Sequence, residues 1–271
     1  EVFAGAYHSA FKGRGMAFDS VRPYEPGDDP RSIDWNVTAR MDAPFIKTYT
    51  EDRELTVLLV LDSSASCFFG TQGAQKRDIA AELGAVLALT ATSNNDKVGL
   101  LVFGETFEHY VPPRKGRNHV LRVIRDLLTV YPDDRAGDLA RALRTANQVL
   151  HQRAIVFVLS DFLAAPSEYA QALAVTGKRH DVIAVVLHDT LESQWPDVGL
   201  VALHDAETDS PALIDSGRAA WREAFAQRAA RFAQRRDATL AEARVDRVDI
   251  RTDGDIVRAL TVFFHNRAGR R

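Results

Sequence analysis

The chain has 271 residues, of which 46% are hydrophobic, and its formal net charge at pH 7 is -3. This length and apolar content are typical of a globular protein, either one large α/β domain or a domain with an appendage. The small negative charge gives no general reason to expect nucleic acid or an anionic membrane surface as a partner. A single cysteine, Cys67, excludes an internal disulfide and a cysteine-rich zinc site. The single cysteine also fits a reducing compartment, so we expect a cytoplasmic protein. No apolar run is long enough to cross a bilayer, so we expect no membrane segment.

The first part of the chain is rich in turn residues. Glycines and prolines are spaced too closely between residues 1 and 50 for a long helix. We therefore expect an N-terminal appendage at residues 1–53 and the main domain at residues 54–271. Within the appendage, the segment YEPGDDPRSIDW (residues 24–35) combines tight turns with a dense set of charges. We interpret it as a structural clasp that ties the appendage to the main sheet, in preference to a binding surface.

The apolar run at residues 55–61 predicts a central parallel strand, because it is short, rich in Val and Leu, and followed by small polar residues. The loop after it carries Asp62, Ser64 and Ser66 at alternate positions. One carboxylate and two hydroxyls in this arrangement can turn toward a single point, and such hard oxygen donors suit Mg²⁺ or Mn²⁺. The alternative is that the three residues only cap the next helix or shape a turn.

The rest of the chain alternates between helical and strand patterns, which predicts a doubly wound α/β fold. We expect helices at residues 75–93, 118–128, 138–150, 167–176, 217–236 and 255–264. We expect strands at residues 98–103, 106–111, 154–160, 181–187 and 245–250, with short strands at 198–203 and 212–214 that extend the sheet. Gly104 and Glu105 predict a two-residue hairpin turn, so the mainly parallel sheet should have one antiparallel edge strand.

Asp161 directly follows the strand predicted at residues 154–160, as Asp62 ends the strand at 55–61. In doubly wound sheets, ligands bind at the carboxyl ends of the strands, where the strand order reverses. If these two strands are neighbours, both carboxylates converge with Ser64 and Ser66. A divalent ion would compensate the two acids, which otherwise raise each other's pKa.

These features resemble a known fold and a known family. The order of elements, the Asp62-x-Ser64-x-Ser66 loop and the Ser160-Asp161 ending are similar to the von Willebrand factor A fold with its metal-ion-dependent adhesion site (MIDAS). More narrowly, YEPGDDPRSIDW, EDRELTVLLVLDSSAS and VGLLVF resemble the bacterial family labelled "domain of unknown function 58". The resemblance implies a von Willebrand factor A-like domain that acts with a MoxR-type AAA+ ATPase in assembling or activating other complexes.

By this resemblance, Asp62, Ser64, Ser66 and Asp161 correspond to metal-site positions. The fifth position departs from the family pattern, because Gly137 stands where a threonine is usual. Either Asp138 or water supplies that ligand, or the metal binds weakly or not at all.

Three functions follow from these observations. The first, which we favour, is a non-enzymatic module whose Mg²⁺ or Mn²⁺ ion binds an acidic side chain of a partner protein. The second is a metal-dependent hydrolase or phosphatase, although the chain has no Gly-x-Ser-x-Gly motif and no P-loop. The third is a scaffold whose metal site has decayed.

Overall fold

The computed structural model describes residues 2–11, 17–41, 43–50, 54–71, 73–106, 108–130, 136–204 and 210–269. A six-stranded sheet forms its centre, with the strand order β10-β7-β6-β3-β4-β5. All neighbouring strands run parallel except β4 and β5, which pair antiparallel at one edge. The strands are β3 (Thr56–Asp62), β4 (Lys97–Phe103), β5 (Glu108–Arg114), β6 (Ile155–Ser160), β7 (Asp181–His188) and β10 (Asp246–Arg251). The doubly wound, mainly parallel sheet with one antiparallel edge strand is therefore confirmed.

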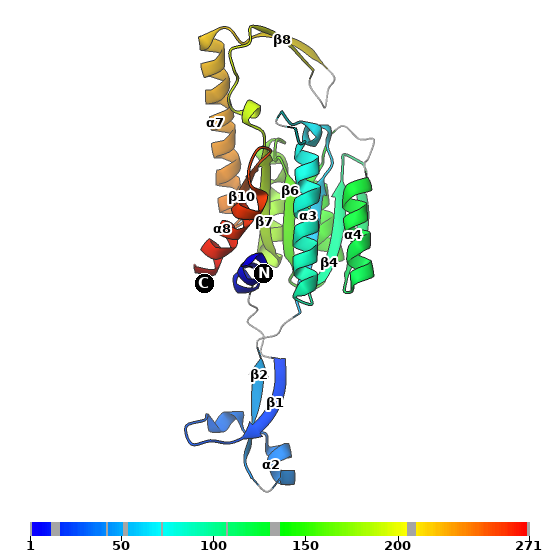
Figure 1. The fold of residues 1–271 in the computed structure, drawn as a ribbon, viewed down its shortest axis with the longest axis vertical. Coiled ribbons are helices and arrows are strands. Elements are labelled where there is room, and N and C mark those ends of the chain that lie inside the picture. Colours follow the sequence, from blue (N-terminus) through cyan, green and yellow to red (C-terminus); the bar gives the residue numbers. More distant parts are fainter. Residues whose placement is uncertain are drawn as a thin grey trace.

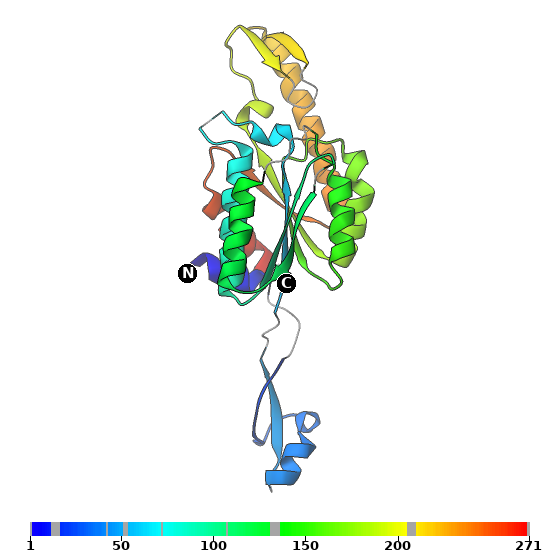
Figure 2. The same cartoon turned by 90° about the vertical axis from the view of Figure 1, so that its right-hand side faces the viewer.

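Helices cover both faces of the sheet, which is seen between two helical layers in Figure 2. One layer holds α1 (Val2–Ala10), α3 (Lys76–Ser93), α4 (Arg117–Thr129) and α8 (Ile256–Gly269), and the other holds α5 (Leu139–Val149), α6 (Pro166–Arg179) and α7 (Ala219–Glu242). In β3, Leu59 and Leu61 pack against the first layer, and Leu58 and Val60 pack against the second. Because both faces of this strand are buried, its sequence is a continuous apolar run rather than an alternating one.

Helix α1 belongs to the main core, whereas we had assigned it to the appendage. It packs against α8, the last helix of the chain (Figure 1). Tyr7 and Phe11 are buried, and both of their rings contact the ring of Phe264, with centroids 5.8 and 5.5 Å apart. The physical reason is that this short segment carries enough aromatic surface to fill a gap beside α8, which the turn-rich sequence after it obscures.

Tyr7 also anchors α1 through a buried acid. Its hydroxyl donates to Asp96 Oδ2 at 3.2 Å, and the backbone N–H of Leu55 donates to Asp96 Oδ1 at 2.9 Å. Burial raises the pKa of Asp96 to about 6, although these hydrogen bonds oppose the rise. The folded state therefore holds this proton more tightly than the unfolded state does.

We expect Asp96 to make the protein less stable as the pH rises from about 4 to about 6, and to have no further effect above that range. In Asp96→Asn this contribution is absent. Subtracting the wild-type free energy of unfolding from that of the variant should give a difference that grows by roughly 2 kcal/mol over this pH range. Urea unfolding at pH 4, 5, 6 and 7 measures it, with the exposed-site variant Glu82→Gln as control. A difference that is flat with pH, or that shrinks, would contradict the assignment.

The remaining N-terminal residues form a separate unit that lies apart from the sheet in both views (Figures 1 and 2). It consists of β1 (Ala17–Pro23), η1 (Pro30–Ser32), α2 (Trp35–Met41) and β2 (Phe45–Thr50). Its charges pair internally, with Arg22 to Asp28 at 2.7 Å and Lys47 to Asp34 at 3.5 Å. These ion pairs therefore hold the turns of the appendage itself. They do not tie the appendage to the main sheet, as the expected clasp would.

Two expectations about the strands and their connections were wrong. β8 (Leu200–His204) and β9 (Pro211–Asp215) do not extend the main sheet but form their own antiparallel pair. Residues along β8 alternate between exposed and half-buried, a pattern that suits a projecting hairpin and not a buried parallel strand. The turn between β4 and β5 is also longer than two residues, because pairing begins only at Phe103 with Glu108.

The edge strand β5 continues through Pro112 and Pro113, where we expected it to end. Proline is tolerated on an edge strand because its missing N–H faces no neighbouring strand. The register shifts beside these prolines, and a Cβ on Gly99 of β4 would lie 2.8 Å from the ring of Pro113. Glycine at residue 99 therefore allows the strand to pair with the proline segment.

None of the helices in the described part of the chain is both long enough and apolar enough to span a bilayer.

Candidate metal site

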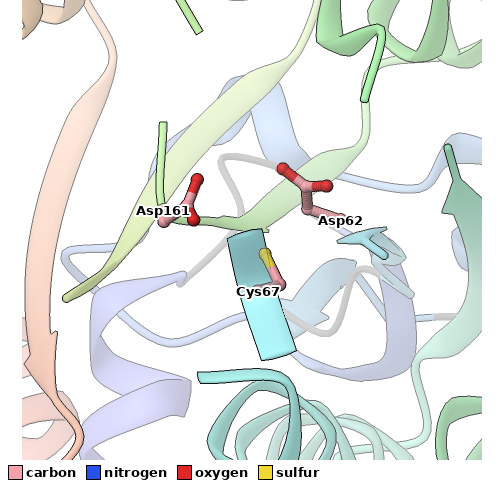
Figure 3. A group of neighbouring side chains, drawn as sticks. All are labelled: Asp62, Cys67 and Asp161. Carbon is pink, nitrogen blue, oxygen red and sulfur yellow. The ribbon is translucent and has the colours of Figure 1, made fainter. Parts of the chain in front are cut away.

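The two predicted acids meet at the carboxyl edge of the sheet. Asp62 is the last residue of β3, and Asp161 directly follows β6, its parallel neighbour. One carboxylate oxygen of each acid and the sulfur of Cys67 all lie within 4.8 Å of one another. Figure 3 shows these three side chains side by side. The parallel register of the strands brings them together, because it places equivalent ends at the same level.

Hydrogen bonds fix the Asp62 carboxylate on both of its oxygens. Oδ1 accepts from the backbone N–H of Ser64 at 3.0 Å, and Oδ2 accepts from the hydroxyl of Ser160 at 2.5 Å. Burial and the nearby charge of Asp161 raise the pKa of Asp62 to about 6, against the effect of these hydrogen bonds. The acid is thus held in place, while burial and the charge of Asp161 disfavour its ionised form.

The two predicted serines lie beside Asp62, where the chain turns into the short helix η2 (Ala65–Phe68). Their hydroxyl oxygens are 3.1 Å apart. Ser64 is buried and Ser66 is half-buried, so Ser66 is the most accessible member of the group that also includes Asp62 and Asp161. Access to this mostly enclosed cluster is therefore best on the Ser66 side.

Gly137 also lies against this group. A Cβ at this residue would be 3.1 Å from Asp62 Oδ1 and 3.2 Å from the Cβ of Ser64. This is the residue at which the family resemblance places a threonine. The glycine brings its backbone close to Asp62 and supplies no side-chain ligand.

Asp138, the proposed substitute, is not brought into the cluster. Its Oδ1 accepts from the backbone N–H of Arg141 at 2.8 Å and so caps the start of α5, while its other oxygen lies 3.8 Å from the guanidinium of Arg144. Capping satisfies a helical N–H that would otherwise have no partner, and it turns the carboxylate toward the helix. Asp138 is therefore a helix cap in this structure.

The site also contains a buried lysine that was not predicted from the sequence. Lys76 is fully buried at the start of α3, and its ammonium donates to Asp161 Oδ2 at 2.6 Å and to Glu192 Oε1 at 2.5 Å. Burial alone would lower the pKa of Lys76, but the charges of Asp161 and Glu192 outweigh it and raise the pKa. The sequence did carry a signal, because Lys76 precedes Ile79 and Leu83 on the buried face of the helix.

A third acid, Asp189, lies just after β7 at the same edge of the sheet but has a structural role. It accepts hydrogen bonds from Thr71 Oγ1 at 2.6 Å, Thr252 Oγ1 at 2.7 Å and the backbone N–H of Leu191 at 3.0 Å. Burial would raise its pKa, yet these bonds together lower it to about 2. Asp189 therefore ties three loops together as a charged and fully satisfied carboxylate.

The donor chemistry of the cluster fits a hard divalent cation. Asp62, Asp161, Ser64 and Ser66 offer carboxylate and hydroxyl oxygens, the ligands such ions prefer. Burial, together with the two acids, raises the pKa of Cys67 well above its ordinary value, so its thiol is neutral at neutral pH and is a poor ligand in that form. The oxygen donors fit an ion, but Lys76 already supplies a positive charge to Asp161.

The structure thus defines a doubly wound α/β domain with acids and hydroxyls gathered at the carboxyl edge of its sheet. The family model described as "Protein of unknown function DUF58" matches residues 20–235. The chain belongs to this family.

Proteins with similar sequences occur in mycobacteria. An uncharacterized protein of Mycobacterium tuberculosis is 35% identical over 209 residues, which are 76% of this chain. The chain spans 66% of the length of that relative. An uncharacterized protein of Mycobacterium avium is 32% identical over 163 residues, which are 58% of this chain and 93% of that protein.

Solved structures with similar folds include von Willebrand factor A domains. The SpRpn10 VWA domain has a TM-score of 0.42 and 10% identity, covering 77% of this chain and 94% of that one. A von Willebrand factor type A protein from Catenulispora acidiphila has a TM-score of 0.41 and 11% identity, covering 83% of this chain and 43% of that one. The mussel byssus protein PTMP1, solved with a zinc-occupied MIDAS motif, has a TM-score of 0.39 and 13% identity, covering 50% of this chain and 38% of that one.

Proposed function

We propose that this protein is a non-enzymatic interaction module that binds an acidic side chain of a partner protein through a Mg²⁺ or Mn²⁺ ion. The observation that carries the proposal is that carboxylate oxygens of Asp62 and Asp161 lie within 4.8 Å of each other. Beside them, the N–H of Ser64 donates to Asp62, and the hydroxyls of Ser64 and Ser66 are 3.1 Å apart. Asp62, Ser64 and Ser66 would hold the ion, and Asp161 would do so directly or through water. The ion would supply the positive charge that attracts the partner's carboxylate.

The surface beside the site supports a protein partner. Phe69 and Leu163 are large apolar residues with exposed fractions of 39% and 42%. The N–H of Leu163 donates to Asp161 Oδ1. The centroid of the Phe69 ring lies 6.0 Å from the Lys76 ammonium, which donates to the same acid. The cores of protein interfaces are richer in apolar and aromatic residues than the rest of the surface.

The partner we propose is a MoxR-type AAA+ ATPase, and the process is the assembly or activation of other complexes. This part of the proposal rests on the family resemblance. A cytoplasmic location would bring the two proteins together.

Capture from a bacterial lysate tests the proposal. We expect the wild-type protein to retain a MoxR-type AAA+ ATPase in Mn²⁺ and to lose it in EDTA, because the ion links the two proteins. Asp62→Asn should retain none under either condition, whereas Glu82→Gln, on the exposed face of α3, should behave as wild type. Turnover of a phosphate ester that Asp62→Asn abolishes would instead identify a hydrolase.

Gly137 and Lys76 favour a second candidate, a scaffold whose metal site has decayed. Gly137 supplies no side-chain ligand, and Lys76 balances the charge of Asp161 without a metal. In this case, capture of the ATPase by the wild type would be the same with and without EDTA.

A further inference from the structure

Lys76 occupies an unusual position for a lysine. Its side chain has an exposed fraction of 0%, and lysine is rarely buried unless it is paired. Its ammonium lies between Asp161, at the end of β6, and Glu192, in the short helix η3 (Thr190–Glu192). Asp161 belongs to the candidate metal site, whereas Glu192 does not.

The ammonium cannot easily leave this position. Asp161 and Glu192 both accept hydrogen bonds from it, and the backbone N–H of Lys76 donates to the carbonyl of Phe69 at 3.0 Å. Moving the charge away would leave the buried Asp161 without its counter-ion, which is costly in a protein interior. Lys76 is therefore a fixed positive charge bonded to one of the proposed metal ligands.

A fixed charge in this place opposes a second cation. The ammonium of Lys76 donates a hydrogen bond to Asp161 Oδ2, and the N–H of Leu163 donates to Asp161 Oδ1. A divalent ion at Asp62, Ser64 and Ser66 would share Asp161 with Lys76 and would be repelled by it across a short, poorly solvated distance. Lys76 also gives the metal-free protein the charge balance that an ion would otherwise provide.

We infer that Lys76 lowers the affinity of the site for divalent cations, because it holds Asp161 and repels the ion. Lys76 is thus a positioning residue. The inference rests on the proposed metal site and adds a determinant to it. The inference also assigns a role to Glu192, since its negative charge offsets part of the repulsion between the Lys76 ammonium and the ion.

Mn²⁺ titration by calorimetry tests the inference, with circular dichroism to confirm that each variant is folded. We expect Lys76→Met to bind Mn²⁺ about tenfold more tightly than the wild type, or better, because the repulsion is gone. Glu192→Gln should bind it more weakly, because the full lysine charge then faces the ion. Lys97→Met is the matched control, since Lys97 pairs with Glu54 at the amino end of β4. Its affinity should equal that of the wild type.

The outcomes separate the two proposals. Unchanged or weaker binding in Lys76→Met would overturn the inference and leave the metal-dependent function standing. Binding in Lys76→Met but not in the wild type would support the inference and overturn metal dependence in the natural protein. If neither binds, the metal site itself is wrong and the inference falls with it. Should Lys76→Met fail to fold, unchanged or tighter binding by Glu192→Gln overturns the inference and weaker binding supports it.

Discussion

Replacing Lys76 with methionine is expected to lower the free energy of unfolding by about 3 to 5 kcal/mol in metal-free buffer. The substitution keeps the length and apolar surface of the side chain but leaves Asp161 buried without a counter-ion and Glu192 without its partner. Removing one member of a buried ion pair costs this much because the remaining charge has lost both its partner and its water. Urea unfolding followed by circular dichroism, in the presence of a chelator, measures the loss.

Lys97→Met again provides the comparison, because Lys97 is a lysine of 46% exposed side chain paired with Glu54. Exposed ion pairs contribute little, so its loss should stay below about 1 kcal/mol. Equal losses in the two variants would show that Lys76 is not a buried counter-ion. Saturating Mn²⁺ should return part of the stability to Lys76→Met, since an ion then replaces the missing charge.

Phe264→Ala should lower the free energy of unfolding by about 3 to 5 kcal/mol, the usual cost of removing a buried aromatic ring. Phe264 is fully buried, and its ring contacts those of Tyr7, Phe11 and Phe157. The side chain thus joins α1 and α8 to the central strand β6. We also expect hydrogen exchange in α1 to accelerate in the variant, because the helix has lost its main contact.

The control for this prediction is Val262→Ala, on the same helix at a side chain with an exposed fraction of 51%. It should cost well under 1 kcal/mol, in line with other surface substitutions. A loss in Phe264→Ala no larger than in this control would contradict the packing of α1 into the main core.

The sequence was sufficient to predict the central part of the fold. The apolar run before Asp62 and the run before Asp161 both became buried parallel strands, and they are neighbours as the proposed convergence required. These predictions succeeded because a strand buried on both faces has a distinctive composition, and because parallel strands present equivalent ends at one edge. The positions of Asp62, Ser64, Ser66 and Asp161 followed from that.

The features that escaped prediction depend on contacts between distant segments. The partner of α1 is Phe264, near the other end of the chain, and no local pattern identifies that contact. Lys76 was missed because lysine is normally a surface residue, and only Asp161 and Glu192 make its burial tolerable. The β8–β9 pair was assigned to the main sheet because short strand patterns do not reveal which strand they join.

The central claim is that Asp62, Ser64 and Ser66 bind a divalent ion, and titration of the wild type and of Asp62→Asn with Mn²⁺ tests it most directly. The amide keeps the shape of the acid and a hydrogen-bond acceptor for the N–H of Ser64, so the fold should persist while the charge is lost. The account predicts saturable binding in the wild type and none in Asp62→Asn. Equal binding by the two proteins, or no binding by the wild type, would contradict it.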